Sequence, residues 1–339
     1  MSDNTSDEEQ QQQMKEISIC ADIWLEIFAL FSPRELGQLM ALISDRFDRL
    51  VAEHFKTRKW SLGLLRILRA IDGNGAIVKQ SSGEQLSIPQ RPLPNKVIGF
   101  EKIEISYIDR SVIEFLQSIR RLFNSSGTTV AIFTFEDQSR SWDIIRQKIW
   151  PLINDNIRHL RVHAYQLDCL RRDFPAILRN CTNLRSIDGL FLEFPADDNA
   201  DASSAQAVAK WLLTPRGDGL PKMLRCDFDS AGMEGLKGAF VTALEPVNFI
   251  ICLYFRGCIS PFGLTNNLGE RLELRCFGEY KWLLLRRPIA REEAKAVSEE
   301  GIELEASRKR NRIAINFEDS DIGDGMLDAN DEGPSEPKK

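Results

Sequence analysis

Acyl-transfer chemistry would most simply use one of the few histidines beside a cysteine. The chain of 339 residues has three histidines and seven cysteines. His159 and His163 fall in one strand-like run, on the face opposite Leu160 and Val162, and Cys169 follows shortly after. A nucleophilic pair also needs a group that orients the base and a turn that presents the nucleophile, and the sequence offers neither. A structural role for these residues is the stronger prediction.

Signals for a metal or a nucleotide are equally weak. Cys252, Cys258 and Cys276 lack the tight CxxC spacing that is typical of zinc sites. The turn at residues 72–75, DGNG, is flanked by neither of the glycine-rich patterns of phosphate-binding loops. We therefore expect no cofactor, no metal and no catalytic residue, and the predicted function is binding.

Charge is unevenly distributed along the chain. The net charge is -6, but residues 1–13 carry four acids and no base, and residues 318–336 carry eight acids and no base. Without these twelve acids the remaining chain has a net charge of +6. Acidic, polar ends of this kind predict disorder at residues 1–16 and 318–339. The body has no dense Lys and Arg stripe interleaved with aromatics, which argues against nucleic acid as a partner.

The sequence also bears on the compartment. The N-terminus has no basic and apolar run of a secretory signal. The longest apolar run, residues 240–255, is interrupted by Glu245, Pro246 and Asn248 and is too short to span a bilayer. An odd number of cysteines without a signal peptide predicts reduced thiols. We expect a protein of the cytoplasm, the nucleus or both, without a membrane partner.

The segment at residues 19–51 carries more large apolar side chains than two helices of its length can bury against each other. Residues 21–31 are expected to form a first helix that is apolar around well over half of its circumference. Ser32, Pro33 and Glu35 match a capping box with proline at the first helical position, which predicts the start of a second helix. Its apolar stripe of about four turns consists of Leu36, Leu39, Met40, Ile43, Phe47, Leu50 and Val51.

This surplus of apolar surface needs a cover. At roughly 25 cal/mol per Å², leaving side chains such as Trp24, Phe28 and Phe31 in water forgoes several kcal/mol of burial. Two explanations remain open at this point. Either the helical pair docks on the rest of the chain, or it receives a partner protein.

The chain after the helical segment alternates strand-like and helical runs. Residues 60–94 predict a small β meander followed by a proline-rich connector. Within residues 95–290, strand-like runs start near residues 102, 129, 158, 185, 223 and 249, each followed by apolar residues at helical spacing. LRNCTNLRSI has the rhythm of a leucine-rich repeat, so we predict an α/β (or α+β) fold with a degenerate leucine-rich-repeat-like solenoid. A doubly wound α/β domain is the alternative.

The end of the repeat region predicts antiparallel strands. ERLELRCF and YKWLLLRRPI read as two terminal antiparallel strands. Residues 291–317 then predict a charged helix over 291–308 and one possible last strand, RIAINF. The predicted order is thus a polar tail, a helical segment at residues 17–59, the meander, the repeats, the charged helix with its strand, and an acidic tail.

The order of residues in the helical segment resembles a known motif. The segment has an aliphatic start at Ile19, an acidic Asp22, then LEIF, a SPREL break and ISDRFDRL. About forty residues here resemble the F-box, with one departure: Ile19-Cys20 stands where F-boxes usually have Leu-Pro. Two segments of the remaining chain, KVIGFEKIEISYIDRSVIEFL and NFEDSDIGDGM, resemble sequences of the large F-box protein family of plant-parasitic cyst nematodes.

The resemblance implies an adaptor. F-box helices would insert into the Skp-type linker of a cullin-based SCF ubiquitin ligase, the repeats would hold a substrate protein, and no residue would perform bond chemistry. The adaptor-binding residues implied are Ile19, Cys20, Ile23, Trp24, Ile27, Phe28, Pro33, Leu36, Leu39, Ile43, Phe47 and Leu50. The alternative is a protein-binding scaffold whose F-box-like helices only cap the solenoid.

A row of polar residues in the repeats is the predicted substrate surface. Residues such as Ile103, Leu160 and Leu224 are expected to face the core, which turns the alternate positions outward along one face. A mixed-charge row suits a protein epitope better than nucleic acid, which favours one sign of charge. The row consists of Glu104, His159, Arg161, His163, Arg225, Asp227, Glu273 and Arg275.

Overall fold

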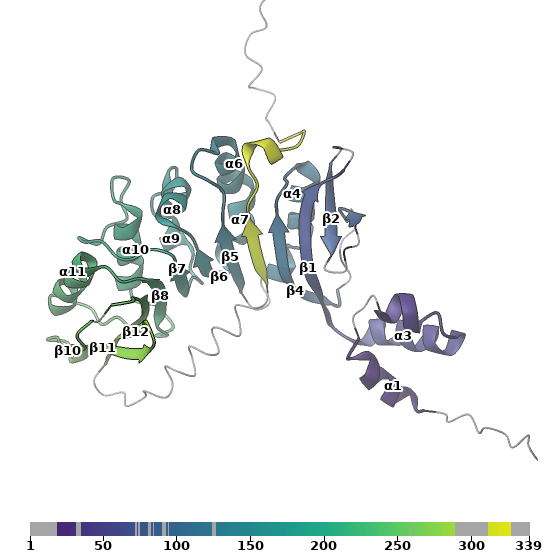
Figure 1. The fold of residues 1–339 in the computed structure, drawn as a ribbon, viewed down its shortest axis with the longest axis horizontal. Coiled ribbons are helices and arrows are strands. Elements are labelled where there is room, and N and C mark those ends of the chain that lie inside the picture. Colours follow the sequence, from purple (N-terminus) through teal and green to yellow (C-terminus); the bar gives the residue numbers. More distant parts are fainter. Residues whose placement is uncertain are drawn as a thin grey trace, which may run out of the picture. The chain divides into compact units, whose positions relative to one another are not determined.

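The computed structural model divides the chain into two compact units, residues 1–60 and 61–339 (Figure 1). It describes residues 19–31, 35–71, 73, 75–80, 83, 85–89, 93, 95–123, 127–257, 259–288 and 311–326. The predicted tail at residues 1–16, Pro33, Cys258, the charged helix at residues 291–308 and the last residues of the acidic tail lie outside this range. Within it, no helix combines the length and the apolar character needed to cross a membrane.

The helical unit is built from three short helical segments around a small core. They are α1 (Ala21–Phe28), the π-helical turn η1 (Leu36–Met40) and α3 (Asp45–Thr57). Phe28, Leu36 and Val51 are its buried hydrophobic residues. Trp24 packs against this core with its ring edge-on to Phe47, at 4.7 Å between centroids. The core therefore contains few residues, and each of them contributes a large part of the stability of the unit.

The prediction of one long second helix was wrong. The helix breaks after η1, and Ser44 adopts an extended conformation with φ -167° and ψ 163°. Its hydroxyl accepts a hydrogen bond from the Phe47 amide at 3.4 Å, which caps the start of α3. Ser44 followed by the acidic Asp45 is an N-cap signal within the sequence, and it outweighs the continuous apolar stripe.

The second unit is organised by one sheet of 13 strands in the order β10-β11-β12-β9-β8-β7-β6-β5-β13-β4-β1-β2-β3. Antiparallel strands form both of its edges. One edge holds β10 (Phe262–Thr265), β11 (Glu270–Gly278) and β12 (Lys281–Pro288). The predicted pair β11 and β12 is confirmed, whereas β10 was not predicted. The other edge is the predicted meander, β1 (Trp60–Arg69), β2 (Ala76–Gln80) and β3 (Gln85–Ser87). The meander belongs to the large sheet, so it is not a separate domain.

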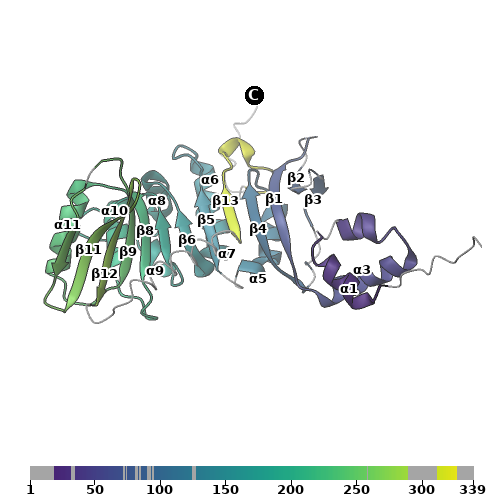
Figure 2. The same cartoon turned by 60° about the horizontal axis from the view of Figure 1, so that its bottom comes forward.

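The centre of the sheet is parallel, and all six predicted repeat strands lie in it. They are β4 (Val97–Ile105), β5 (Thr128–Ile132), β6 (Ile157–Arg161), β7 (Ser186–Asp188), β8 (Lys222–Asp227) and β9 (Phe249–Tyr254). Figure 2 shows these strands side by side, with the connecting helices along one face. The connections contain α4 (Arg110–Ser118), α5 (Arg120–Phe123), α6 (Ser139–Ile144), η2 (Ile145–Ile149), α7 (Trp150–Ile153), η3 (Asn154–Asn156), α8 (Ala164–Arg171), α9 (Ile177–Asn180), α10 (Ser204–Leu213) and α11 (Ser230–Val241). The fold is thus mixed α/β.

The last strand occupies an unexpected place. β13 (Arg312–Ile315) pairs in parallel with β4 on one side and β5 on the other, and so separates the first two repeat strands. Ile313 and Ile315 are buried on it. Asn311 precedes it with φ 50°, and its side-chain oxygen accepts a hydrogen bond from the Phe100 amide at 3.0 Å. The prediction of a terminal strand is confirmed, but that strand is central rather than peripheral.

The first residues of the acidic tail are ordered, which corrects the prediction of disorder from residue 318 onward. Asp319 lies in the short helix η4 (Asp319–Asp321), and its carboxylate accepts hydrogen bonds from the amide and hydroxyl of Ser141, at 2.8 and 2.9 Å. The carbonyl of Asp321 accepts from the Ile108 amide at 3.1 Å. Asp319 therefore caps α6, and the backbone of Asp321 extends the sheet. The charge pattern alone did not distinguish these two roles from those of a solvated tail.

Candidate functional site

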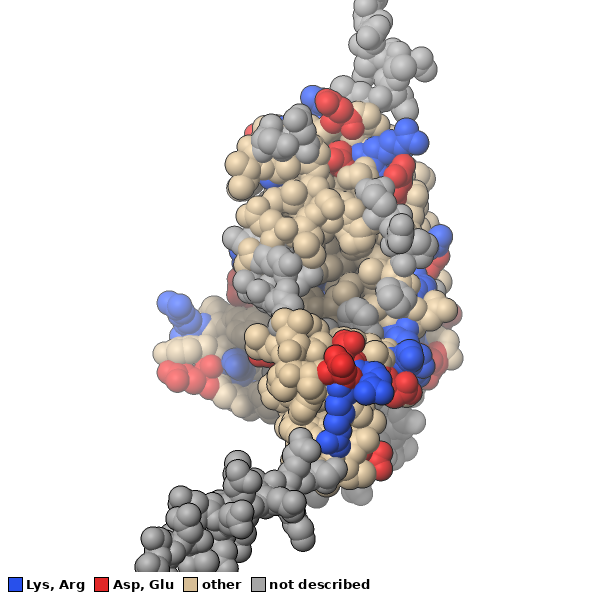
Figure 3. All heavy atoms as spheres, turned by 90° about the vertical axis from the view of Figure 1, so that its right-hand side faces the viewer, with Lys and Arg blue, Asp and Glu red and all other residues tan. Residues whose placement is uncertain are grey.

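The helical unit exposes a set of large apolar side chains. Leu30 is 86% exposed and Leu42 is 80% exposed, which is a large apolar exposure for a unit of only about forty described residues. Ile23, Phe31, Leu39 and Ile43 are also exposed. We call these six residues the apolar patch. Figure 3 is turned toward this unit and shows an uncharged area with Lys, Arg, Asp and Glu mainly along one side of it. Several exposed large apolar side chains in so small a unit are typical of a protein-binding surface.

The predicted adaptor-binding residues separate into three groups by exposure. Cys20, Ile23, Leu39 and Ile43 are exposed, and Ile19, Trp24, Ile27, Phe47 and Leu50 are half-buried. Phe28 and Leu36 are 0% and 1% exposed, so their assignment to a binding surface was wrong. They form the core of the unit instead, because the other segments close over them. Leu30, Phe31 and Leu42 are exposed as well but are not among the predicted adaptor-binding residues, although their apolar character was a usable signal.

The start of α1 is ordered even though it lacks the proline of the F-box pattern. Cys20 precedes α1 with φ -57° and ψ 146°, values that a proline at this position also adopts. Its carbonyl accepts a hydrogen bond from the Trp24 amide at 3.3 Å. The Arg46 guanidinium donates to the carbonyl of Ile19 at 2.7 Å and ties this start to α3. The cysteine thus has the backbone geometry that the proline would impose.

A second surface lies at the carboxyl ends of the parallel strands. A cavity of about 340 Å³ is lined by the ends of β5 to β9 and the start of α8. Arg161, Asp188 and Arg225 occupy neighbouring positions on β6, β7 and β8, so that two cations flank one carboxylate across three strands. The exposed aromatic rings of Phe133 and Tyr254 lie at its rim. Ligands of open α/β sheets commonly bind at this edge.

Gly189 makes the close spacing of these strand ends possible. Its φ is 143°, and a Cβ atom there would lie 1.8 Å from the carbonyl oxygen of Val162. Its amide donates to the carbonyl of Arg225 at 3.0 Å, and the Val162 amide donates to the carbonyl of Asp188 at 3.0 Å. Only glycine fits this position, and it holds β6, β7 and β8 together at the cavity.

The structure brings half of the predicted substrate row together. Arg161, His163, Arg225 and Asp227 all line the cavity. Glu104 lies on β4, where it pairs with Lys102 at 2.9 Å and with Arg66 at 3.6 Å. Glu273 and Arg275 form a separate ion pair of 2.7 Å on β11. Phe133 and Tyr254 were not predicted, although VAIFTF and CLYF place an aromatic residue directly at each strand end.

One residue of the predicted outward row is buried instead, and part of the same sheet face is apolar. His159 is only 5% exposed, because it sits in the middle of the parallel block between Thr129 and Ser186 of the neighbouring strands. On β8, β9 and β12 the corresponding face is apolar: Met223, Ile250 and Leu285 are buried and form one cluster with Cys252 and Leu283. The residues expected to face the core, such as Leu160 and Leu224, are buried as predicted.

Two thiols at and beside the cavity are poor nucleophiles. Burial raises the pKa of Cys226, which lines the cavity, and of Cys169, which lies on α8 beside it. A thiol with a raised pKa stays protonated at neutral pH and does not attack a carbonyl. Among the described residues, no group of three or more His, Cys, Asp and Glu side chains could hold a metal ion. The chain matches no family model, no curated protein and no solved structure.

Proposed function

We propose that the chain is the substrate-recognition adaptor of an SCF-type ubiquitin ligase. In this proposal the helical unit is an F-box that binds a Skp-type linker, and the second unit is a leucine-rich-repeat-like body that binds a substrate protein. The chain itself performs no bond chemistry. It raises the effective concentration of substrate lysines near a ubiquitin-loaded conjugating enzyme, in the cytoplasm or the nucleus.

The apolar patch carries the proposal. The unit already has a closed core of Phe28, Leu36 and Val51, so Leu30, Leu39 and Leu42 are not needed to fold it. This many exposed leucines lower the solubility of the unit and do not add to its stability. When a partner covers them, binding gains roughly 25 cal/mol per Å² of buried apolar area. The order SPREL followed by ISDRF in the same segment supports a Skp-type protein as that partner.

The cavity at the carboxyl ends of the strands supports the substrate half of the proposal. It combines Arg161 and Arg225 with the exposed aromatic rings of Phe133 and Tyr254. Arginine and aromatic side chains contribute most of the binding energy in many protein interfaces. The carboxylates of Asp188 and Asp227 in the same cavity favour a mixed-charge protein segment over a polyanion.

The adaptor half is tested by mixing the purified full chain with a purified Skp-type adaptor and separating the mixture by size exclusion. A stable one-to-one complex is expected. The variant Leu42→Asp should keep the fold and lose the complex. Leu244→Asp is the matched control, because Leu244 is 90% exposed but lies in the sheet unit. The absence of a complex with the unmodified chain would refute the proposal and favour a binding scaffold without a ligase.

The substrate half needs a reconstituted ligase. With adaptor, cullin and conjugating enzyme present, a bound substrate should receive ubiquitin, and Tyr254→Ala together with Arg161→Ala should reduce that transfer without changing adaptor binding. A transfer rate that stays unchanged in this double variant would move the substrate surface elsewhere on the chain.

A further inference from the structure

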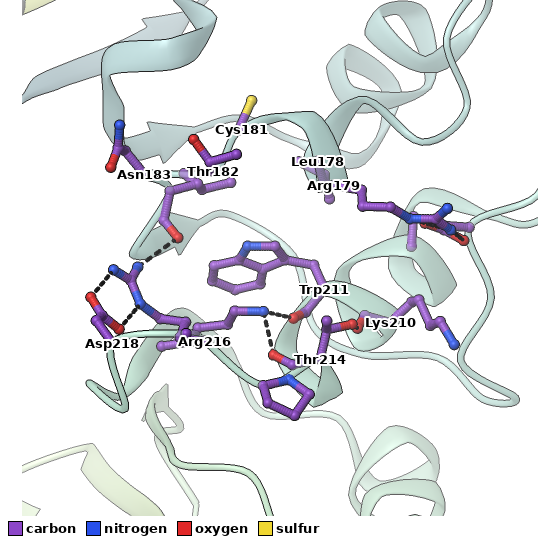
Figure 4. Close-up of a pocket in the computed structure, with 16 residues that line it drawn as sticks. Leu178, Arg179, Cys181, Thr182, Asn183, Lys210, Trp211, Thr214, Arg216 and Asp218 are labelled. Atoms are coloured by element: carbon purple, nitrogen blue, oxygen red, sulfur yellow. Dashed lines mark hydrogen bonds and ion pairs between the residues drawn. The ribbon is translucent and has the colours of Figure 1, made fainter. Parts of the chain in front are cut away.

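A second cavity lies at the opposite ends of the strands, beside the amino ends of β7 and β8. Its volume is about 410 Å³, and it is enclosed by α9, α10 and the turns that precede the two strands. Figure 4 shows the indole of Trp211 in the middle of the lining, with Arg216 and Asp218 on one side and Arg179 on the other. Leu178, Leu184 and Ala207 complete its apolar wall. This size lies within the range of cavities that hold small molecules.

The charged side chains that line this cavity carry a net positive charge. Two of its arginines are neutralised: Arg216 binds both carboxylate oxygens of Asp218 at 2.9 and 2.6 Å, and Arg179 binds Asp198 at 2.6 Å. The pKa of Asp218 is lowered to about 2, chiefly by its hydrogen bond from Arg216, so that pair stays ionised. Lys210 and Lys222 also line the cavity, and neither makes an ion pair with any residue that the structure describes. The lining therefore carries two uncompensated positive charges.

Lys222 is the more unusual of the two lysines. It is 6% exposed, and its ammonium donates to the carbonyls of Trp211 and Thr214, the latter at 2.6 Å. The nitrogen lies 5.1 Å from the centroid of the Trp211 ring. These carbonyls end α10, so Lys222 caps that helix with two of its three N–H groups. Burial, followed by repulsion from Arg216, lowers the pKa of Lys222 to about 8. A buried cation without an anion is unfavourable, and a bound anion removes that cost.

We propose that this cavity binds a small anion with a flat apolar body, such as an aromatic carboxylate, whose charged group lies at Lys222 and whose ring packs against Trp211, with Lys210 adding positive charge at the edge of the cavity. The apolar wall supplies the contact for the ring, and the two lysines select for negative charge. The site lies at the amino ends of the strands, away from the cavity proposed for the substrate protein, and is independent of it.

The test uses the full chain with benzoate as the probe and benzamide as its neutral analogue, in a ligand-observed NMR titration. Benzoate should bind saturably at millimolar concentrations, and benzamide at least tenfold more weakly, because it lacks the charge. Equal binding of the two probes, or no saturable binding of benzoate, would overturn the proposal.

Two substitutions locate the site. Lys222→Met should weaken benzoate binding at least tenfold, with thermal unfolding recorded alongside because Lys222 also caps α10. Lys210 is exposed and caps no helix, so Lys210→Met should weaken benzoate binding without affecting the fold. If Lys222→Met unfolds, Lys210→Met is the variant that tests the site. Lys148→Met, an exposed lysine of η2 outside this cavity, is the matched control. Binding that survives both cavity substitutions would refute the assignment.

The pH dependence separates the proposed site from a merely apolar cavity. Anion binding needs the protonated ammonium, so affinity should fall as the pH rises through about 8, where Lys222 loses its proton. Two neighbouring groups keep one charge state over this range, because the pKa of Asp218 is about 2 and burial raises that of Cys181 to about 12. The other charged groups of the lining are Arg179, Asp198, Lys210 and Arg216. A profile that stays flat between pH 7 and 9 would contradict a role for Lys222.

Discussion

Leu42 and Leu274 are both leucines, but they differ sharply in their exposure to solvent. Leu42 in the helical unit is 80% exposed, whereas Leu274 on β11 of the sheet unit is 1% exposed. The difference extends to the units as a whole. The helical unit buries three hydrophobic residues in its core cluster and leaves twice as many apolar side chains in its patch, whereas the sheet unit has buried hydrophobic residues on strands from β11 to β2. Surplus apolar surface is thus concentrated in the smaller unit.

The two units also differ in whether another segment of the chain completes them. The sheet unit is completed from within the chain, because β13 returns from the C-terminal region to fill the space between β4 and β5. Among the described residues of the helical unit, no segment from elsewhere in the chain plays this role, and the six side chains of the apolar patch are exposed. A unit that is completed internally needs no partner to be stable, and a unit that is not completed is suited to completion by another protein.

Removing β13 is the largest change that the contrast predicts. A chain that ends at residue 310 should lose the cooperative unfolding transition of the sheet unit, because β4 and β5 then have no strand between them. The single substitution Ile315→Ala should cost about 2–5 kcal/mol of the free energy of unfolding. Urea denaturation followed by near-UV circular dichroism measures both effects.

The control for this experiment is Arg110→Ala, which removes an exposed ion pair with Glu114 and should change stability by less than about 1 kcal/mol. Adding a peptide of residues 311–326 to the shortened chain should restore part of the transition. A shortened chain that unfolds like the full chain would show that β13 is peripheral to the fold.

The core and the patch of the helical unit should respond differently to the same kind of truncation. Phe28→Ala should cost about 3–5 kcal/mol, because Phe28 is fully buried. Leu42→Ala should change stability by about 0.5 kcal/mol or less, because Leu42 is mostly exposed. Hydrogen exchange of peptides from α1 and α3 resolves the unit from the sheet. Equal losses of protection in the two variants would mean that Leu42 is part of the core.

Cys20→Pro should stabilise the helical unit slightly. The φ of -57° at Cys20 is already that of a proline, so the substitution restricts the unfolded chain without straining the folded one. An increase of about 0.4–1 kcal/mol in the free energy of unfolding is expected. Cys20→Ala, which leaves the backbone unrestricted, is the control. A loss of stability in Cys20→Pro would show that the start of α1 differs from the geometry described above.

His54 should make the helical unit sensitive to acid. Burial, followed by repulsion from Arg58, lowers the pKa of His54 below its ordinary value of 6.5. The folded unit therefore prefers the neutral imidazole, and this contribution is complete above pH 6.5 and is lost as the pH falls through the lowered pKa. The protection factors of α3 amides, which are corrected for the intrinsic exchange rate at each pH, should decrease between pH 7 and pH 5, and His54→Phe should remove most of that change. An equal decrease in His54→Phe would assign the acid sensitivity to another group.

The sequence was informative wherever the pattern is local. Alternation in IRHLR and MLRCDFD predicted β6 and β8, and the glycine-containing turns predicted the meander, because these signals depend on neighbouring residues only. The place of RIAI between β4 and β5 could not be predicted, because a short apolar strand does not specify its neighbours across about two hundred residues. The same limit explains why Met223 and Ile250 were not recognised as a second apolar face.

The candidate sites follow the same rule. Arg161 and Arg225 were predicted as outward residues from alternation, and the fold brings them to one cavity. Lys222 gave no signal in the sequence, since only the tertiary position of the α10 carbonyls buries its ammonium. Phe28 and Leu36 were misassigned because helical spacing alone does not say which part of a wide apolar surface faces the core.

The central claim, that the apolar patch of the helical unit binds a Skp-type adaptor, is tested most directly by calorimetric titration of the full chain with such an adaptor. We expect saturable binding with one adaptor per chain. We also expect at least a hundredfold weaker binding for Leu42→Asp and unchanged binding for Leu244→Asp, because burying an unpaired carboxylate in the interface is costly. Equal affinities for these two variants, or no heat of binding for the unmodified chain, would contradict it.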